Sequence, residues 1–212
     1  MAARPLRIVV LVIVAFAAGL LLARLLVPGK VAPPQLEQAT VFPAPRALPT
    51  LDLVDQDGKP LPPRFFYGHW TLVFFGFTQC PDICPTTLAT LAQANKQFGD
   101  LPAGSRPRVL LVSVDPERDT AAILKPYVTF FDPSFQGATG TLTATTAAAT
   151  AFSVPFAKVP LPGGGYTIDH GAGLFIVSPA GALSAYLSPP LDATVLARDY
   201  RKVVQYFEES HR

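Results

Sequence analysis

The sequence predicts an α/β domain that follows a membrane-spanning segment at the N-terminus. Strand-like and helix-like segments alternate along most of the 212 residues, which is the order expected of a sheet covered by helices. Two of these segments, at 69–77 and 108–115, are almost continuously apolar, as strands buried on both faces are. A longer apolar run lies near the N-terminus, and its length fits a membrane helix better than a core element.

The N-terminal apolar run is predicted to be an uncleaved membrane anchor. Of the 20 residues from Ile8 to Val27, 18 are apolar, and twenty helical residues span about 30 Å, the thickness of a bilayer core. A cleaved signal peptide is the alternative, since Ala15-Phe16-Ala17 resembles a cleavage site, but the apolar run continues ten residues beyond it. We therefore expect a short cytoplasmic tail at 1–7 and a single-pass anchor at 8–27. The domain that follows would be periplasmic, on a bacterial inner (cytoplasmic) membrane.

Residues 28–49 are predicted to form an extended linker to a domain at 50–212. They contain six prolines, which exclude a regular helix or a central strand and favour a semi-rigid spacer. The charge distribution fits the same division. Residues 1–30 hold four basic residues and no acidic one, so the rest of the chain carries 13 − 15 = −2. A slightly acidic domain argues against nucleic acid as a partner.

The elements of the domain are assigned from local patterns in chain order. A hairpin is expected at Leu51–Pro62, because Asp57-Gly58 is a strong turn signal. The buried strand His69–Phe77 is followed by a helix at Cys84–Phe98 and by a second buried strand at Arg108–Asp115. The remaining elements are two helices, a hairpin and a terminal amphipathic helix, expected at Asp119–Phe131, Thr143–Phe152, Leu174–Val177 with Ala182–Leu187, and Leu191–Glu208.

The two cysteines of the chain, Cys80 and Cys84, lie where the first buried strand gives way to a helix. A strand–helix–strand unit with a cysteine pair at this point predicts a thioredoxin-like domain, although thioredoxins have two residues between their cysteines and this chain has three. If the helix begins near Pro81, the two sulfurs lie on one side of its start, where the helix dipole favours thiolate. Inert packing and a structural disulfide remain alternatives, but redox or metal chemistry is the better interpretation of the clustering.

Two thiolates form a soft anionic pair that suits Cu(I), and a third ligand would complete the site. The candidates are His69, His170 and His211. His69 lies at the end of the predicted strand remote from the cysteines, and His211 is the penultimate residue, so His170 is the best candidate. We expect His170 in a loop, with the preceding glycines at 163–165 folding over the site.

Three motifs resemble the Sco/SenC family. They are Phe77-Thr78-Gln79-Cys80-Pro81-Asp82-Ile83-Cys84-Pro85, Ser113-Val114-Asp115-Pro116-Glu117-Arg118-Asp119-Thr120 and Tyr166-Thr167-Ile168-Asp169-His170. The resemblance covers about residues 50–207. It implies a membrane-tethered, thioredoxin-like copper protein that helps to assemble the binuclear copper centre of cytochrome c oxidase.

By this resemblance, Cys80, Cys84 and His170 match the copper ligands, Cu(I) and Cu(II) are both bound, and the cysteines can cycle to a disulfide. Asp169 would support the adjacent histidine. For the second motif we expect Asp119 to cap the following helix and Arg118 to lie on the surface.

The favoured function is a copper metallochaperone rather than an enzyme. Its partners would be the copper-accepting subunit of the oxidase and a copper donor chaperone or thiol reductant. The alternative is a thiol–disulfide oxidoreductase that reduces the acceptor cysteines, for which His170 would be dispensable. Both roles can coexist. A thiol peroxidase on the same fold is a weaker third hypothesis, because no peroxide-site motif is recognised.

Overall fold

The computed structural model describes residues 8, 9, 11–19 and 32–210, and the chain divides into two compact units. One comprises Met1–Pro33 with Tyr206–Arg212, and the other Pro34–Gln205. The described residues among 8–19 are helical, whereas the rest of the predicted tail, anchor and first part of the linker (1–7, 10 and 20–31) lies outside the described residues. In the described part of the chain, no helix combines the length and apolar character needed to cross a membrane.

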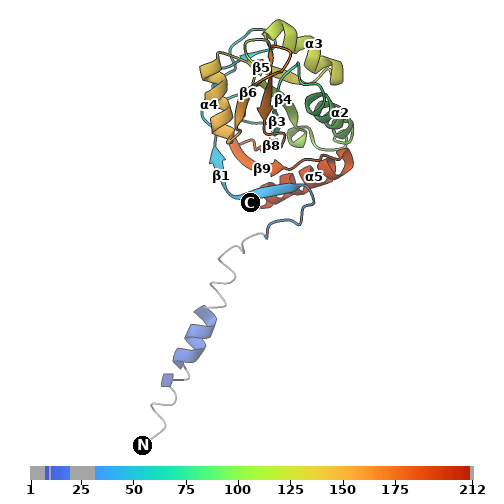
Figure 1. Ribbon diagram of the computed structural model, residues 1–212. Coiled ribbons are helices and arrows are strands. Elements are labelled where there is room, and N and C mark those ends of the chain that lie inside the picture. Colours follow the sequence, from blue (N-terminus) through green and yellow to red (C-terminus); the bar gives the residue numbers. More distant parts are fainter. Residues whose placement is uncertain (1–7, 10, 20–31, 211–212) are drawn as a thin grey trace, which may run out of the picture. The chain divides into compact units, whose positions relative to one another are not determined.

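The described residues of the second unit form a seven-stranded mixed sheet in the order β1-β9-β8-β3-β4-β5-β2 (Figure 1). The central strands β3 (Thr71–Gly76) and β4 (Arg108–Ser113) run parallel, and all six residues of β3 are buried, as its apolar sequence predicts. The other strands are β1 (Ala39–Ala47), β2 (Val54–Asp55), β5 (Gln136–Thr139), β8 (Leu174–Val177) and β9 (Ala182–Leu187).

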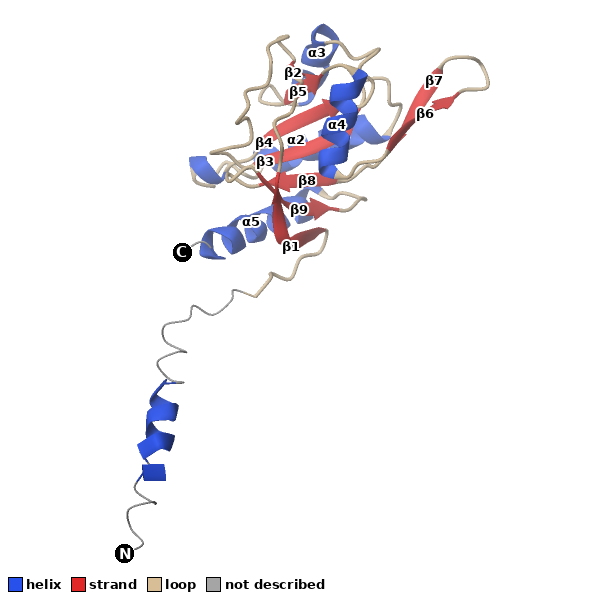
Figure 2. Ribbon diagram, turned by 90° about the vertical axis from the view of Figure 1, so that its left-hand side faces the viewer, coloured by secondary structure: helices blue, strands red, loops and turns tan. Residues whose placement is uncertain are grey.

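Helices cover both faces of this sheet (Figure 2). Successive residues of a strand face opposite sides. Phe75 of β3 packs against Phe152 of α4 (Leu142–Phe152), whereas the next residue, Gly76, lies against Cys84 of α2 (Ile83–Lys96). The remaining helices are the short 3-10 helix η1 (Ala103–Ser105), α3 (Ala121–Phe131) and α5 (Ala193–Ser210).

A second, two-stranded sheet stands apart from the first. It is a hairpin of β6 (Phe156–Pro160) and β7 (Tyr166–His170), joined by a turn in which Gly164 and Gly165 have positive φ. Figure 2 shows it projecting from the body of the unit, with the glycine-rich turn at its far end. The histidine predicted to lie in a loop is therefore the last residue of a strand. The glycines do not fold over it, because they are at the opposite end of the hairpin.

Two other expectations are corrected. The predicted linker contains the edge strand β1, which pairs antiparallel with β9 at both ends. Its register shifts between Val41 and Arg46, where Pro43 and Pro45 lack backbone N–H groups to donate. The predicted Leu51–Pro62 hairpin is reduced to a tight turn at Gly58, because β2 pairs with β5 and makes a single bridge, from Val54, to the following segment.

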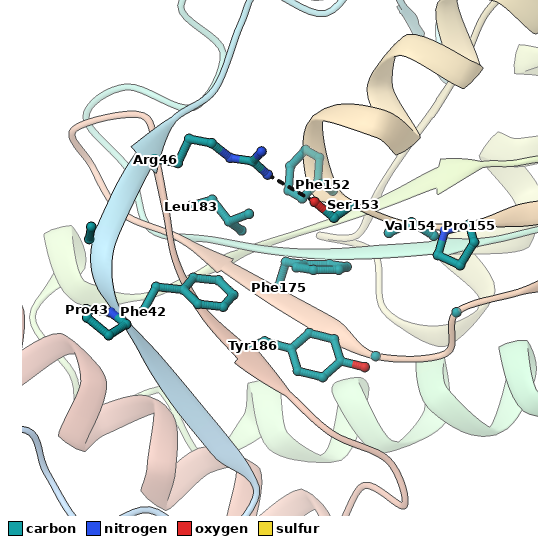
Figure 3. Close-up of a pocket in the computed structure, with 13 residues that line it drawn as sticks. Phe42, Pro43, Arg46, Phe152, Ser153, Val154, Pro155, Phe175, Leu183 and Tyr186 are labelled. Atoms are coloured by element: carbon teal, nitrogen blue, oxygen red, sulfur yellow. Dashed lines mark hydrogen bonds between the residues drawn. The ribbon is translucent and has the colours of Figure 1, made fainter.

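The irregular middle of β1 leaves a cavity of about 700 Å³ beside the sheet (Figure 3). Aromatic side chains of β1, β8 and β9 line it, among them Phe42, Phe175 and Tyr186, and Arg46 spans its edge to Ser153, with a 3.3 Å hydrogen bond. The prolines thus explain both the broken pairing and the cavity.

Candidate metal centre

The two cysteines come from the connection between β3 and α2. Cys80 lies in the loop and Cys84 in the first turn of the helix. A side-chain carbon at Gly76, the last residue of β3, would lie 3.0 Å from the Cys84 sulfur and 2.8 Å from Phe74. Glycine at this position therefore lets the strand approach the buried sulfur. A glycine that ends an apolar strand just before a cysteine pair is a signal for this contact in the sequence.

The cysteines are four residues apart in the sequence, and both are free thiols. Cys84 is fully buried, whereas Cys80 is half-buried. The backbone N–H of Cys84 donates to the Cys80 sulfur over 3.4 Å. The start of the helix thus offers its unpaired N–H to a sulfur, in the geometry that the four-residue spacing predicts.

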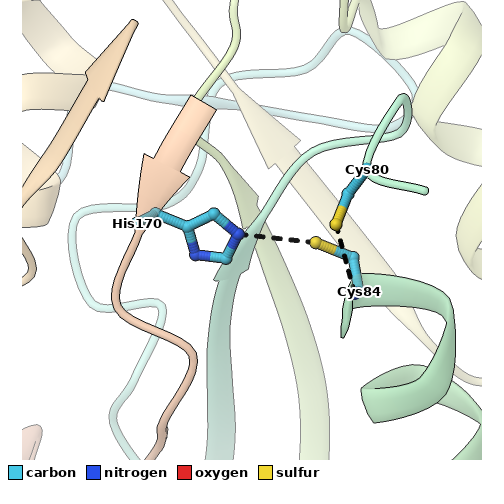
Figure 4. A group of neighbouring side chains, drawn as sticks. All are labelled: Cys80, Cys84 and His170. Carbon is cyan, nitrogen blue, oxygen red and sulfur yellow. Dashed lines mark hydrogen bonds between the residues drawn. The ribbon is translucent and has the colours of Figure 1, made fainter. Parts of the chain in front are cut away.

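His170 completes the cluster from the end of β7 (Figure 4). Its Nε2 lies 3.5 Å from the Cys84 sulfur, and its Nδ1 lies 3.0 Å from the carbonyl oxygen of Gly171. A carbonyl oxygen can only accept, so Nδ1 carries the proton and Nε2 directs its lone pair at the sulfurs. The rings of Phe74 and Phe77 flank the imidazole in T-shaped arrangements, with centroids 6.2 and 5.8 Å away.

The ligand atoms of Cys80, Cys84 and His170 all lie within 4.8 Å of one another. Three ligand atoms around one metal ion lie roughly 3.5–4 Å apart when the bonds are about 2.0–2.3 Å. Small side-chain shifts would therefore close the cluster around an ion. Two sulfurs and one imidazole nitrogen are the donors that copper and zinc prefer.

Burial favours the uncharged forms of Cys84 and His170 in the metal-free protein. It raises the pKa of the Cys84 thiol well above its usual range, and a hydrogen bond with the Phe77 backbone opposes this only in part. Burial also lowers the pKa of His170, although its contacts with Gly171 and the charge of Asp169 act in the opposite direction. The expectation that the helix start favours thiolate at both cysteines is thus wrong for Cys84, where desolvation outweighs the dipole. An arriving cation would supply the missing stabilisation of the thiolate.

Asp119 supports the cysteine loop and does not cap a helix. The N-cap of α3 is Thr120. The buried Asp119 carboxylate accepts hydrogen bonds from the Thr78 backbone N–H (3.0 Å), from the Thr78 hydroxyl (2.5 Å) and from the Ser113 hydroxyl (2.6 Å). It therefore ties the end of β4 to the residue two positions before Cys80. Burial raises the pKa of this carboxyl, and the hydrogen bonds from Ser113 and Thr78 oppose the rise.

Arg118 is not a free surface residue either. It forms an ion pair with Asp115 and donates to Gln79 Oε1 (3.0 Å) and to the carbonyl oxygen of Tyr166 (3.1 Å). Asp169, in contrast, is exposed on the outer face of β7 and influences His170 only through its charge.

Of the other two histidines, the structure describes only His69, and this residue does not belong to the cluster. His69 is exposed in a bend before β3, at the end of that strand remote from the cysteines. His211 lies outside the described residues.

The fold and this cluster together define a class of protein, namely a thioredoxin-like domain with a Cys–Cys–His site at the start of its first helix. The chain belongs to the SCO1/SenC family, whose profile matches residues 43–205. A protein of Stutzerimonas stutzeri is 38% identical over 167 residues, which cover 77% of this chain and 80% of that protein.

Two further relatives extend the comparison. The mitochondrial SCO2 homologue of Bos taurus is 33% identical over 156 residues, which cover 73% of this chain and 59% of the bovine protein. The chain thus spans less than two thirds of that relative. The crystal structure of Arabidopsis thaliana ScoI with copper bound superposes with a TM-score of 0.67 and 30% identity, over 78% of this chain and 98% of the other.

Proposed function

We propose that the protein is a membrane-anchored copper metallochaperone that serves the binuclear copper site of cytochrome c oxidase. It binds Cu(I) or Cu(II) through Cys80, Cys84 and His170 and passes it to the copper-accepting subunit. The observation that carries the proposal is the convergence of two sulfurs and one imidazole nitrogen within 4.8 Å. Membership of the SCO1/SenC family and the copper-bound Arabidopsis relative support copper as the cargo.

The unequal accessibility of the ligands suits a site that must release its cargo. The buried Cys84 would hold the ion, whereas the half-buried Cys80 can meet an incoming ligand. Binding of Cu(I) to two thiolates releases two protons and leaves a centre of net charge −1, which the helix N-terminus stabilises. In transfer, a thiolate of the acceptor bonds to copper as the Cys80 thiolate leaves. The number of copper–sulfur bonds is conserved, and Cys80 regains a proton.

The anchor and the extracytoplasmic location belong to the same proposal. They are supported by the apolar run at 8–27 and by the exposed apolar side chains of its described helical residues, such as Leu11 and Phe16. Alkaline extraction of membranes tests them, because the full chain should stay in the membrane pellet. Release into the supernatant would contradict the anchor.

Copper titration of the reduced protein tests the proposed site. We expect one tight equivalent of Cu(I) or Cu(II), loss of tight Cu(I) binding in Cys84→Ser, and much weaker Cu(II) binding in His170→Ala. His69→Ala is the matched control, since this exposed histidine should not contribute. A wild-type protein without a one-equivalent site, or a Cys84→Ser variant with unchanged affinity, would overturn the proposal.

Thiol–disulfide exchange is a second candidate function, favoured by two free thiols four residues apart, with the Cys84 backbone N–H donating to the Cys80 sulfur. The accessible Cys80 would attack a disulfide of the acceptor, and Cys84 would resolve the mixed disulfide. Two thiols of this protein become one disulfide while one acceptor disulfide becomes two thiols. If acceptor reduction requires both cysteines but persists in His170→Ala, this activity is present; if it is absent from the wild type, the candidate fails.

A further inference from the structure

The β6–β7 hairpin carries His170 but is weakly packed on the domain. Of the ten residues in its two strands, all of which the structure describes, only Ile168 is buried. A cavity of about 320 Å³ lies at its base, between Ile168, Phe156 and the turn after β4. A two-stranded hairpin is marginally stable in water by itself. Polar contacts with the body must therefore contribute to its position.

Alternate residues of β7 face the body. Ile168 is buried and Asp169 exposed, so Tyr166 and His170 share the inward side with Ile168. Whatever holds Tyr166 against the body therefore acts on the same face of the same short strand that presents the imidazole.

Arg118 contacts both the β6–β7 hairpin, which carries His170, and the loop that carries Cys80. Its guanidinium donates to the Tyr166 carbonyl oxygen and lies 3.9 Å from the centre of the Tyr166 ring. The same Nη1 donates to Gln79, the residue before Cys80. Asp115, which is 1% exposed, pairs with Arg118 and accepts a 2.9 Å hydrogen bond from the Tyr166 hydroxyl. We call Arg118, Asp115, Gln79 and Tyr166 the Arg118 clasp.

A second ion pair also reaches the hairpin, but it is less suited to fix it. Lys158 of β6 lies 2.5 Å from Glu117, and both side chains are about half exposed. Such pairs contribute little in water. The side chain of Arg118 is 23% exposed and makes planar, multi-partner contacts that a lysine cannot reproduce.

We propose that Arg118 is the positioning residue that docks the β6–β7 hairpin against the cysteine loop and thereby sets the place of His170 over the two sulfurs. The inference rests on the proposed function, because it concerns the imidazole of the proposed copper site. Its chemical consequence depends on the oxidation state of the cargo. Two thiolates suffice for Cu(I), whereas Cu(II) favours nitrogen ligands and tetragonal geometry. The Arg118 clasp therefore determines chiefly the affinity for Cu(II).

The test uses three variants of the full chain. Arg118→Gln removes both the positive charge and the planar, multi-donor guanidinium group. Arg118→Lys keeps the charge that pairs with Asp115 but lacks the guanidinium group. Arg201→Gln is the matched control, since Arg201 is 33% exposed and binds Asp100 and the Gln97 carbonyl oxygen, neither of which belongs to the metal centre. The readouts are Cu(II) and Cu(I) affinities by competition, the electron paramagnetic resonance spectrum of the Cu(II) form, and amide hydrogen exchange of residues 156–170 without metal.

We expect Arg118→Gln to weaken Cu(II) binding about 10- to 100-fold, the range for residues that orient a metal ligand. Its Cu(II) spectrum should differ from that of the wild type, and amides of the hairpin should exchange faster in the metal-free protein. Cu(I) affinity should change much less. Arg118→Lys should recover part of the Cu(II) affinity, and Arg201→Gln should match the wild type.

The proposal is overturned if hairpin exchange and the Cu(II) spectrum of Arg118→Gln equal those of the wild type, or if Arg201→Gln loses as much Cu(II) affinity. It is also overturned if Cu(I) and Cu(II) affinities fall equally, since the effect would then not act through the imidazole. A wild-type protein that binds no copper would instead refute the proposed function. In that case, hydrogen exchange in metal-free Arg118→Gln still decides whether Arg118 docks the hairpin.

Discussion

The two halves of the metal centre are attached to the domain in different ways. The cysteine half is continuous with the core, because it follows the fully buried β3 and is tied to β4 by the buried carboxylate of Asp119. The histidine half is a hairpin with one buried strand residue, held mainly by polar contacts. The difference suggests a site with a fixed thiol pair and a dockable imidazole. Such a division lets a protein retain copper on sulfur while it adjusts the third ligand.

Among the predicted effects, the largest is expected from loss of the Asp119 carboxylate, which supports the cysteine half of the metal centre. Asp119→Ala leaves the Thr78 N–H and the Ser113 hydroxyl without their acceptor, and we expect the free energy of unfolding to fall by about 2–4 kcal/mol. Asp119→Asn should lose less, because its amide oxygen can still accept. Urea unfolding of the metal-free variants measures both. A loss below about 0.5 kcal/mol in Asp119→Ala would show that the carboxylate does not hold the loop.

The close approach of β3 to Cys84 provides a second test of how the cysteine half is packed. In Gly76→Ala, the new methyl group meets Phe74, the Cys84 sulfur and Leu111 within 3.2 Å. We expect a loss of about 1–3 kcal/mol in unfolding free energy, typical of an overpacked core. Gly163→Ala is the control, since open space surrounds that position. Equal stability of the two variants would contradict the tight contact.

The neutral imidazole should make the metal-free protein sensitive to acid. Because burial lowers the folded-state pKa of His170, its contribution to stability is complete above the ordinary value of 6.5 and is lost as the pH falls toward the lower folded value. The unfolding free energy should therefore decline on acidification over this window, and less steeply in His170→Gln. Identical slopes in the wild type and His170→Gln would refute a buried, neutral His170.

The smallest effect is expected from the outer ion pair of the hairpin. Lys158→Met removes the half-exposed ion pair with Glu117 and the contact of the Lys158 ammonium with the Tyr166 ring, 4.4 Å from its centre. Because both contacts are close to solvent, Cu(II) affinity should change at most about threefold. Competition titration measures the Cu(II) affinity of Lys158→Met, which is then compared with the Cu(II) affinity of Arg118→Gln. If Lys158→Met weakened Cu(II) binding as much as Arg118→Gln, docking of the hairpin would depend on charge in general rather than on the Arg118 clasp.

The sequence predicts the structure of the cysteine half better than that of the histidine half, for physical reasons. The strand at 71–76 and the helix at 83–96 have unbroken local patterns, so their boundaries were predicted within a few residues. The cysteine spacing predicted sulfurs on one side of a helix start. The hairpin strands at 156–160 and 166–170 have five residues each and only one buried residue between them, and three consecutive glycines lie just before the second strand, so His170 was assigned to a loop.

The supporting residues could not be assigned from local pattern. Asp119 accepts a hydrogen bond from Thr78, 41 positions away, and Arg118 donates one to Tyr166, 48 positions away. From local sequence, Asp119 was expected to cap a helix and Arg118 to lie on the surface. Both side chains instead form contacts with residues distant in the sequence. The edge strand β1 was missed because its prolines argue against regular structure, although an edge position tolerates them.

X-ray absorption spectroscopy of the copper-loaded protein tests the central claim most directly, since it counts the sulfur and nitrogen ligands of the bound ion. The account predicts two sulfurs and one imidazole nitrogen in the wild type. It predicts loss of the nitrogen but retention of both sulfurs in His170→Ala, and loss of one sulfur in Cys84→Ser. A copper centre that keeps its imidazole in His170→Ala, or that shows fewer than two sulfurs in the wild type, would contradict it.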